Sequence, residues 1–420
     1  MKKNAFLYIR RGKRESTLIK QKPAFFDENG LFVIICSAIV AILNCIFRLW
    51  SGRILSAADY GNLYSLLSLS NVATVAGVTF ATALARNYAL GKCSPDESEN
   101  LFRYNIAIQL SVAFISFCAL VLLKHNIAES FLVAFYVFLC NVTYYVYGMS
   151  QGLKYFRIMA LHIIILPVLK VILIAPLLAV GLPCIFVFPL MSVAQGVTFI
   201  ACSDLIQKHK IYGISPFLKK DTLAGFFLSL FPMFALAAFS NLHVIIVENA
   251  GDGSDAGAYC FASILCAAML AVPGLITPVL VPYAAASNDH RLLKRALIFS
   301  EIISVILGIV FLIFKHSLFE SFFGQDGASA ERFVFPVFVM SVPLVAIYVT
   351  VYYMVSSGLD KQLTLVCLGT FALLALSLLF LRHGIIAMSY IFAFIYFASA
   401  AAMIYFSTSG IKYNKLRFMI

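Results

Sequence analysis

The sequence predicts an all-α integral membrane protein with about twelve transmembrane helices. Of its 420 residues, 62% are hydrophobic and 12% are charged, whereas soluble domains are about half apolar and about a quarter charged. Apolar runs of spanning length recur from Leu31 to Ser407 with no polar module between them. Because lipid offers the backbone no hydrogen-bonding partner, and strands of this length would expose unpaired edges, we expect every run to be a helix.

Each apolar run has roughly the 20 residues that a helix needs to cross a hydrocarbon core of about 30 Å. The first six runs lie at 31 to 52, 61 to 84, 104 to 123, 129 to 150, 158 to 180 and 183 to 206. The second six lie at 222 to 247, 256 to 285, 296 to 314, 333 to 356, 362 to 381 and 385 to 407. The first run is longer than the apolar region of a signal peptide, so we expect it to remain as a helix.

A weak internal match indicates that the chain has two halves. Ser56-Ala-Ala-Asp-Tyr-Gly61 precedes the second run, and the similar Ser254-Asp-Ala-Gly257 precedes the eighth. Six runs separate the two copies, so they share one orientation in the membrane. We therefore expect a basic segment over 1–30, a first six-helix bundle over 31–206, a linker over 207–221, a second bundle over 222–407 and a basic tail over 408–420, with substrate bound between the bundles.

Lysine and arginine residues gather in alternate loops, which predicts the orientation of the chain. The segment before the first run carries Lys2, Lys3, Arg10, Arg11, Lys13, Arg14, Lys20 and Lys22. With an even number of helices, both termini are expected in the cytoplasm of a bacterium and the helices in its inner membrane. The net charge of +12 therefore indicates topology and contact with membrane lipids, and no nucleic-acid partner is expected.

The sequence contains no pattern typical of an enzyme, a metal site or a bound cofactor. Its ten cysteines stand singly, mostly inside apolar runs, with no CxxC pair and no histidine at ligand spacing. We interpret them as small hydrophobic residues. No nucleotide-binding loop or nucleophile elbow occurs. We therefore expect a protein without catalytic activity, metal or cofactor.

Two ordered segments resemble a family of transporters. The stretch from Arg53 to Tyr64 resembles the segment after the first helix of polysaccharide flippases, the Wzx-type branch of the MOP exporter superfamily. Asn241-Leu-His-Val-Ile-Ile-Val247, Ala256-Gly-Ala-Tyr259, Pro273-Gly274 and Val279-Leu-Val-Pro282 are similar to that family's seventh and eighth helices. The resemblance implies two six-helix bundles in a V around a central cavity.

The same resemblance implies a function and partners. Members of this family export polyprenyl-pyrophosphate-linked oligosaccharides, such as O-antigen or capsule repeat units, by alternating access. The expected partners are therefore the lipid-linked oligosaccharide, membrane lipids, and the polysaccharide polymerase and chain-length machinery.

Basic residues inside apolar runs are the candidates for binding such a cargo. Lys170 stands in the middle of the fifth run, where a lysine costs at least about 2.5 kcal/mol unless it finds a partner or water. A pyrophosphate head group is such a partner, although pairing with an acidic residue or snorkelling also explains Lys170. Arg48 near the end of the first run and Arg53, which matches the family's arginine, are further candidates, as is Asn241.

Three titratable residues are candidates for ion coupling. His243 stands where the family often carries an acidic residue, so either a titrating role or a neutral, hydrogen-bonded histidine explains it. Glu301 lies in the ninth run and Glu248 ends the seventh. Pairing of Glu301 with nearby bases such as Arg295, and solvation of Glu248 beside other acids, are the competing interpretations.

Aromatic and amide side chains inside the runs have two interpretations. Five tyrosines lie near helix ends, which favours the interfacial aromatic belt over stacking on sugar rings; they are Tyr144, Tyr145, Tyr147, Tyr352 and Tyr353. Asn44, Asn71, Gln109, Asn141 and Gln195 are expected to hydrogen-bond between helices or to contact sugar hydroxyls.

Two other functions compete with oligosaccharide export. A multidrug antiporter of the same superfamily would carry organic cations and needs buried carboxylates, whereas Lys170 and Arg48 are positive. A membrane-embedded polymerase or glycosyltransferase needs catalytic residues on a sizeable loop, and the loops here are too short. An anionic cargo is therefore the leading expectation.

Overall fold

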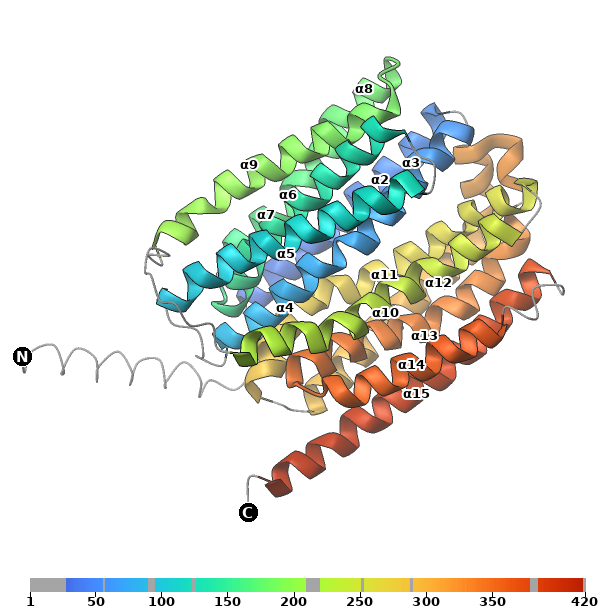
Figure 1. The fold of residues 1–420 in the computed structure, drawn as a ribbon. Helices are drawn as coiled ribbons and strands as arrows, with labels where there is room; N and C mark the ends of the chain where they lie inside the picture. Colours follow the sequence, from blue (N-terminus) through green and yellow to red (C-terminus); the bar gives the residue numbers. More distant parts are fainter. Residues whose placement is uncertain are drawn as a thin grey trace, which may run out of the picture.

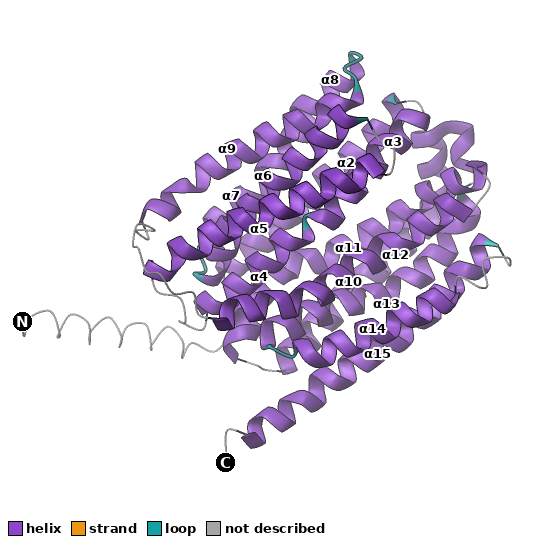
Figure 2. Ribbon diagram, in the orientation of Figure 1, coloured by secondary structure: helices purple, strands orange, loops and turns teal. Residues whose placement is uncertain are grey.

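The computed structural model describes residues 28–55, 57–89, 95–122, 126–208, 220–250, 253–287, 290–328, 330–377 and 384–417. These residues form helices and short connections, without a strand among them (Figure 2). The described residues contain twelve helical segments long and apolar enough to cross a membrane, from Leu31–Ile54 to Ile385–Thr408. The predicted fold class is therefore confirmed. Most of the predicted segment 1–30 and linker 207–221 lies outside the described residues.

The first half of the chain supplies six of these spans (Figure 1). Its helices are α2 (Glu28–Ile54), α3 (Ala57–Ala73), α4 (Val75–Ala89), α5 (Pro95–Leu122), α6 (Ile127–Gly152), α7 (Phe156–Leu169), α8 (Ala175–Ala179) and α9 (Val187–Lys208). Together α3 and α4 make the second span, and α7 and α8 make the fifth with the π-helical turn Lys170–Ile174 between them.

The second half supplies the other six spans in long single helices. These are α10 (Lys220–Ala250), α11 (Gly253–Ser287), α12 (His290–Ala328), α13 (Glu331–Ser357), α14 (Asp360–Ser377) and α15 (Ile385–Arg417). The chain runs back and forth, so Arg86, Lys154 and Asp360 lie at one end of the structure, hereafter the Arg86 end. The opposite end, where α2 finishes, is the Arg53 end.

The side chain of Asn141 on α6 interrupts the second span between α3 and α4. Its Oδ1 accepts a hydrogen bond from the Gly77 N–H at 3.2 Å, and its Nδ2 donates to the Ala73 carbonyl at 3.3 Å. In a continuous helix the Gly77 N–H would donate to that same carbonyl, since the two residues are four apart. The amide has therefore inserted into the backbone ladder and breaks the helix there.

The outer helices expose apolar side chains, as lipid-facing helices do. On α5, Phe114 and Ile115 are 67% and 66% exposed, and on α12 Ile313 is 69% exposed. The inner helices α11 and α13 instead pack against each other and are mostly buried. The packing is that of a protein whose surrounding solvent is hydrocarbon.

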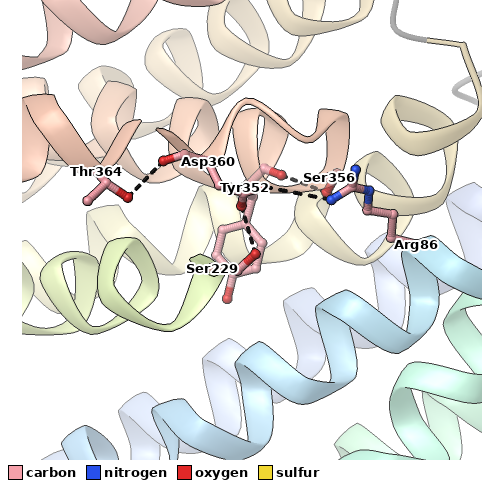
Figure 3. A network of polar contacts seen from close by, with 6 residues as sticks. All are labelled: Arg86, Ser229, Tyr352, Ser356, Asp360 and Thr364. Carbon is pink, nitrogen blue, oxygen red and sulfur yellow. Dashed lines mark hydrogen bonds and ion pairs between the residues drawn. The ribbon is translucent and has the colours of Figure 1, made fainter. Parts of the chain in front are cut away.

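The two halves meet through α2 and α4 of the first half and α10 and α11 of the second. Phe80 of α4 packs edge-on against Phe226 of α10, with ring centroids 5.5 Å apart. At the Arg86 end, Arg86 pairs with Asp360, and Asp360 also accepts a hydrogen bond from Ser229 (Figure 3). Lys154 Nζ lies 4.3 Å from the centroid of the Tyr283 ring at the same end. Polar contacts therefore tie the halves together at the Arg86 end.

Candidate functional site

A cavity of about 580 Å³ lies between the two halves. Helices α2, α3, α4, α6, α7 and α9 line it from the first half, and α11 and α13 line it from the second. On α6 the lining residues Tyr136, Cys140, Tyr144, Tyr147 and Gln151 follow helical spacing, which puts one face of α6 along the cavity. The site is thus built by helix faces rather than by loops.

Lys170 lines this cavity at a local irregularity of the fifth span. The π-helical turn Lys170–Ile174 begins at this residue, and the Ala175 N–H donates to the Lys170 carbonyl, one residue further than in an α-helix. Pro167 and Pro176 flank the turn and each removes a backbone donor. Wider turns of this kind recur at functional sites, because they turn a side chain away from its regular helical position.

The ammonium group of Lys170 forms no ion pair with any residue that the structure describes. Its Nζ lies 5.7 Å from the centroid of the Phe47 ring on α2. An exposed surface lysine needs no partner, but one between packed spans is costly without a counter-charge. The predicted alternative of pairing with an acidic residue therefore finds no support among the described residues.

Arg48 on α2 also lines the cavity, whereas Arg53 does not. The two arginines are five residues apart, which rotates their side chains about 140° from each other around a helix of 3.6 residues per turn. Arg53 accordingly is exposed in the last turn of α2. None of the described lining residues is Asp or Glu, so the fixed charges on the described wall of the cavity are positive.

Aromatic side chains gather in the part of the cavity nearer the Arg86 end. Tyr144, Tyr147 and His162 come from the first half and Tyr348 and Tyr352 from the second, and all five line the cavity. The interfacial-belt interpretation is therefore wrong for Tyr144, Tyr147 and Tyr352, because the helices carrying them turn these rings inward. It is also wrong for Tyr145 and Tyr353, which are fully buried. The pairs Tyr144/Tyr147 and Tyr348/Tyr352, three and four residues apart, were the available signal of a shared helix face.

Three prolines of α11 each leave the carbonyl four residues earlier without its backbone hydrogen bond, and a side chain donates to that carbonyl instead. Pro282 has no N–H for the Pro278 carbonyl, which accepts a hydrogen bond from Gln151 Nε2 of the first half at 2.9 Å. In the same way Thr277 Oγ1 donates to the Gly274 carbonyl at 3.3 Å, left free by Pro278. Ser304 Oγ donates to the Met269 carbonyl at 3.0 Å, left free by Pro273. The helix therefore stays continuous through three prolines, and Gln151 joins the halves.

The amides expected inside the spans divide into two groups. Asn44, Asn71 and Gln195 line the cavity, and Gln195 Oε1 also accepts a hydrogen bond from Thr143 Oγ1 at 3.0 Å. Asn141 bridges the break between α3 and α4, and Gln109 Nε2 donates to Asn105 within α5. The expected bonds between helices are confirmed for Asn141 and Gln195, whereas Gln109 bonds within its own helix. Contact with sugar hydroxyls stays a prediction.

The remaining predicted site residues lie away from the cavity or outside the described residues. Asn241 Nδ2 donates to the Ala237 carbonyl of its own helix at 2.8 Å. His243 is buried, with Nδ1 3.2 Å from the Tyr259 hydroxyl oxygen. Glu301 is half-buried on α12 and forms no ion pair among the described residues. Glu248 belongs to α10, but its side chain lies outside the described residues. Their ion-coupling and binding roles stay predictions.

No protein-family model matches the sequence, and no curated protein matches it. Solved structures do resemble the fold. A mutant of the Vibrio cholerae MATE transporter VcmN superposes with a TM-score of 0.73 at 12% identity over 96% of this chain and 99% of its own. A MATE in complex with MaD5 gives a TM-score of 0.72 at 10% identity over 91% and 94%. A MOP superfamily transporter from Pyrococcus furiosus gives 0.70 at 12% identity over 91% and 94%.

The similarity covers nearly the whole chain and shows the fold. With twelve membrane-spanning helices around a central cavity, the chain has the fold of MOP superfamily transporters, to which the MATE structures belong. The predicted superfamily fold is thereby confirmed. No family model and no curated protein supports the narrower resemblance to the Wzx-type flippases.

Proposed function

We propose that this protein is a flippase for a polyprenyl-pyrophosphate-linked oligosaccharide, an O-antigen or capsule repeat unit. It moves this cargo from the cytoplasmic to the outer face of a bacterial inner membrane by alternating access between its two halves. The observation that carries the proposal is the placement of Lys170 and Arg48 on a cavity whose described lining contains no carboxylate.

The charge of the cavity selects the sign of the cargo. Two unit charges about 4 Å apart interact by about 4 kcal/mol at an effective dielectric constant of about 20. An anionic head group gains an interaction of this order from Lys170 and relieves the repulsion between Lys170 and Arg48. An organic cation is instead repelled by both Lys170 and Arg48. A pyrophosphate, with its several acceptor oxygens, matches both basic groups.

The size of the cavity selects the part of the cargo that enters it. A volume of about 580 Å³ lies within the range of about 300–1,000 Å³ that holds a small organic ligand. This space suits a pyrophosphate with one or two sugar units and excludes a long polyprenyl chain. The polyprenyl chain of the cargo therefore stays in the lipid beside the protein, while the polar head group passes between the two halves.

One structural neighbour indicates that proteins of this fold can differ in the polarity of the binding pocket. The Pyrococcus furiosus transporter is described as having a binding pocket of reverse polarity, which suggests a different function for that MOP superfamily member. By the same reasoning, the basic cavity of this protein supports a cargo of different charge on a shared fold. In this proposal the polymerase and chain-length machinery take over the cargo after release.

Transport in proteoliposomes tests the proposal. Vesicles containing the full-length protein receive a fluorescent polyprenyl-pyrophosphate disaccharide in one leaflet, and its arrival in the other leaflet is followed by quenching. We expect protein-dependent flipping that falls at least about five-fold in Lys170→Gln. Lys361→Gln serves as the matched control, because Lys361 is exposed and does not line the cavity. Efflux of organic cations without lipid flipping would instead support a multidrug antiporter.

A further inference from the structure

We propose that Tyr144, Tyr147, His162, Tyr348 and Tyr352 form a carbohydrate-binding subsite, hereafter the tyrosine cluster. This inference rests on the proposed function, since it assigns the sugar of the cargo to one part of the cavity. The basic residues hold the anionic group, and the tyrosine cluster holds the sugar ring next to it.

The tyrosine cluster draws its rings from both halves of the protein. Tyr348 and Tyr352 of α13 stack with ring centroids 5.1 Å apart and an interplanar angle of 27°. Tyr144 and Tyr147 of α6 are nearly perpendicular, with centroids 6.1 Å apart. His162 of α7 packs against Tyr147 at 5.1 Å. A ligand on this cluster therefore touches the first and the second half at once.

The chemistry of these side chains fits a sugar. Tyrosine presents a flat apolar face and a hydroxyl group, and a pyranose ring presents a C–H face bordered by hydroxyls. Gln151 and Thr82 line the same cavity, and because their donors bond to backbone carbonyls they offer an amide oxygen and a hydroxyl oxygen as acceptors. Such an apolar wall with a few placed polar groups is typical of a small-molecule site.

Two polar side chains of the cavity lining have a buried atom without a hydrogen-bond partner among the described residues. His162 is 9% exposed, lines the cavity, and its Nδ1 has no hydrogen-bond partner among the described residues. Ser37 on α2 is 7% exposed, lines the same cavity, and its Oγ likewise bonds to no described group. Buried polar groups without a partner are uncommon in folded proteins and each asks for an explanation. Neither atom is exposed to the cavity in this conformation, so a ligand hydroxyl would pair with either one only after the side chain rotates.

The arrangement also argues against the other ligand that aromatic clusters bind, an organic cation. Lys170 and Arg48 share the cavity and no described carboxylate lines it, so a cation would be repelled. His162 and Lys170 are eight residues apart on one span, which corresponds to about 12 Å along a helix. That separation matches a pyrophosphate at Lys170 joined to one or two sugar units that reach the cluster.

Binding measurements on the full-length protein in lipid nanodiscs test this assignment. The probes are geranylgeranyl pyrophosphate without a sugar and the same lipid carrying one glucose, galactose or N-acetylglucosamine. We expect at least one glycosylated probe to bind about five-fold tighter or more than the sugar-free probe, as a few additional hydrogen bonds and ring contacts provide. Equal affinity for all four probes would overturn the assignment.

Variants separate the subsite from the anion site. Tyr147→Leu and Tyr348→Leu should bind the glycosylated probe no tighter than the sugar-free one, while affinity for the sugar-free probe is unchanged. Tyr147→Phe keeps the ring and should retain part of the preference, and it serves as the second variant if the leucine variants fail to fold. Tyr405→Leu, on an exposed tyrosine of α15, is the control.

Lys170→Gln should weaken the binding of all four probes by a similar factor. If no probe binds the wild-type protein, the proposed function itself fails. If the probes bind but the tyrosine variants leave the sugar preference intact, only the subsite fails.

Discussion

Arg86 of α4 lies with its Nη1 3.7 Å from Asp360 Oδ2 of α14, and so joins the two halves of the protein at one end of the cavity. Asp360 is 3% exposed, and its Oδ1 accepts a hydrogen bond from Ser229 Oγ at 2.7 Å (Figure 3). Gly358, with φ of +75°, lets the guanidinium approach, since a Cβ there would lie 3.0 Å from Arg86 Cζ. A carboxylate this buried is stable only while its partners remain.

Loss of this pair should loosen the Arg86 end of the cavity. Arg86→Gln leaves the Asp360 carboxylate with hydrogen bonds from Ser229 and the backbone but without a counter-charge. Removing one partner of a buried pair costs up to about 3 kcal/mol when the other partner, here Arg86, is partly exposed. We therefore expect a lower melting temperature and faster labelling of a cysteine placed at Thr82 by a polar maleimide. Lys315→Gln, at the exposed pair with Glu331, should change neither. Unchanged labelling in Arg86→Gln would show that the pair does not close this end.

Gln151 and Pro282 should be coupled in stability. Gln151→Leu leaves the Pro278 carbonyl without a donor, which costs about 1–3 kcal/mol. Pro282→Ala restores a backbone N–H four residues after Pro278 and should reduce the loss caused by Gln151→Leu. Thermal unfolding of the four variants of a double-mutant cycle measures this coupling. Purely additive effects would mean that the freed carbonyl is not what Gln151 satisfies.

Gly77 should tolerate no side chain. A Cβ at Gly77 would lie 2.8 Å from the Cα of Asn141, so Gly77→Ala must push α4 away from α6 and should cost about 1–3 kcal/mol. At Gly196, by contrast, a Cβ meets no atom within 4 Å. Gly196→Ala should therefore be neutral or stabilising, because alanine is about 1 kcal/mol better than glycine in a helix. Similar unfolding temperatures for both variants would contradict the close packing at Gly77.

The sequence was sufficient to predict the class of fold because the membrane limits the solutions. Length and apolarity alone predict each span, since a chain in lipid has few ways to satisfy its backbone. The break at Thr74 and the π-helical turn at Lys170 were beyond such reasoning. The first depends on the Asn141 amide from a helix more than 60 residues away in the chain, and the second on how two prolines are accommodated between packed spans.

Basic residues inside apolar runs predicted the cavity lining better than aromatic residues did. Lys170 and Arg48 stood out because a cation inside an apolar run is costly, and both line the cavity. A tyrosine costs little at an interface or in a core, so Tyr144 and Tyr352 carried no comparable signal. The position of Asn241 in its apolar run did not predict that it bonds within its own helix. The partner of such a side chain depends on which way the helix turns it, which the sequence alone does not give.

Ligand binding to a charge-reversed variant shows whether the cavity selects anions. Affinities of geranylgeranyl pyrophosphate and of tetraphenylphosphonium are measured on the wild-type protein and on Lys170→Glu in nanodiscs. We predict that the wild-type protein binds the pyrophosphate and that Lys170→Glu weakens this binding at least about ten-fold while improving that of the cation. Tighter binding of the cation to the wild-type protein, or a pyrophosphate affinity that Lys170→Glu leaves unchanged, would contradict selection of anions by the cavity.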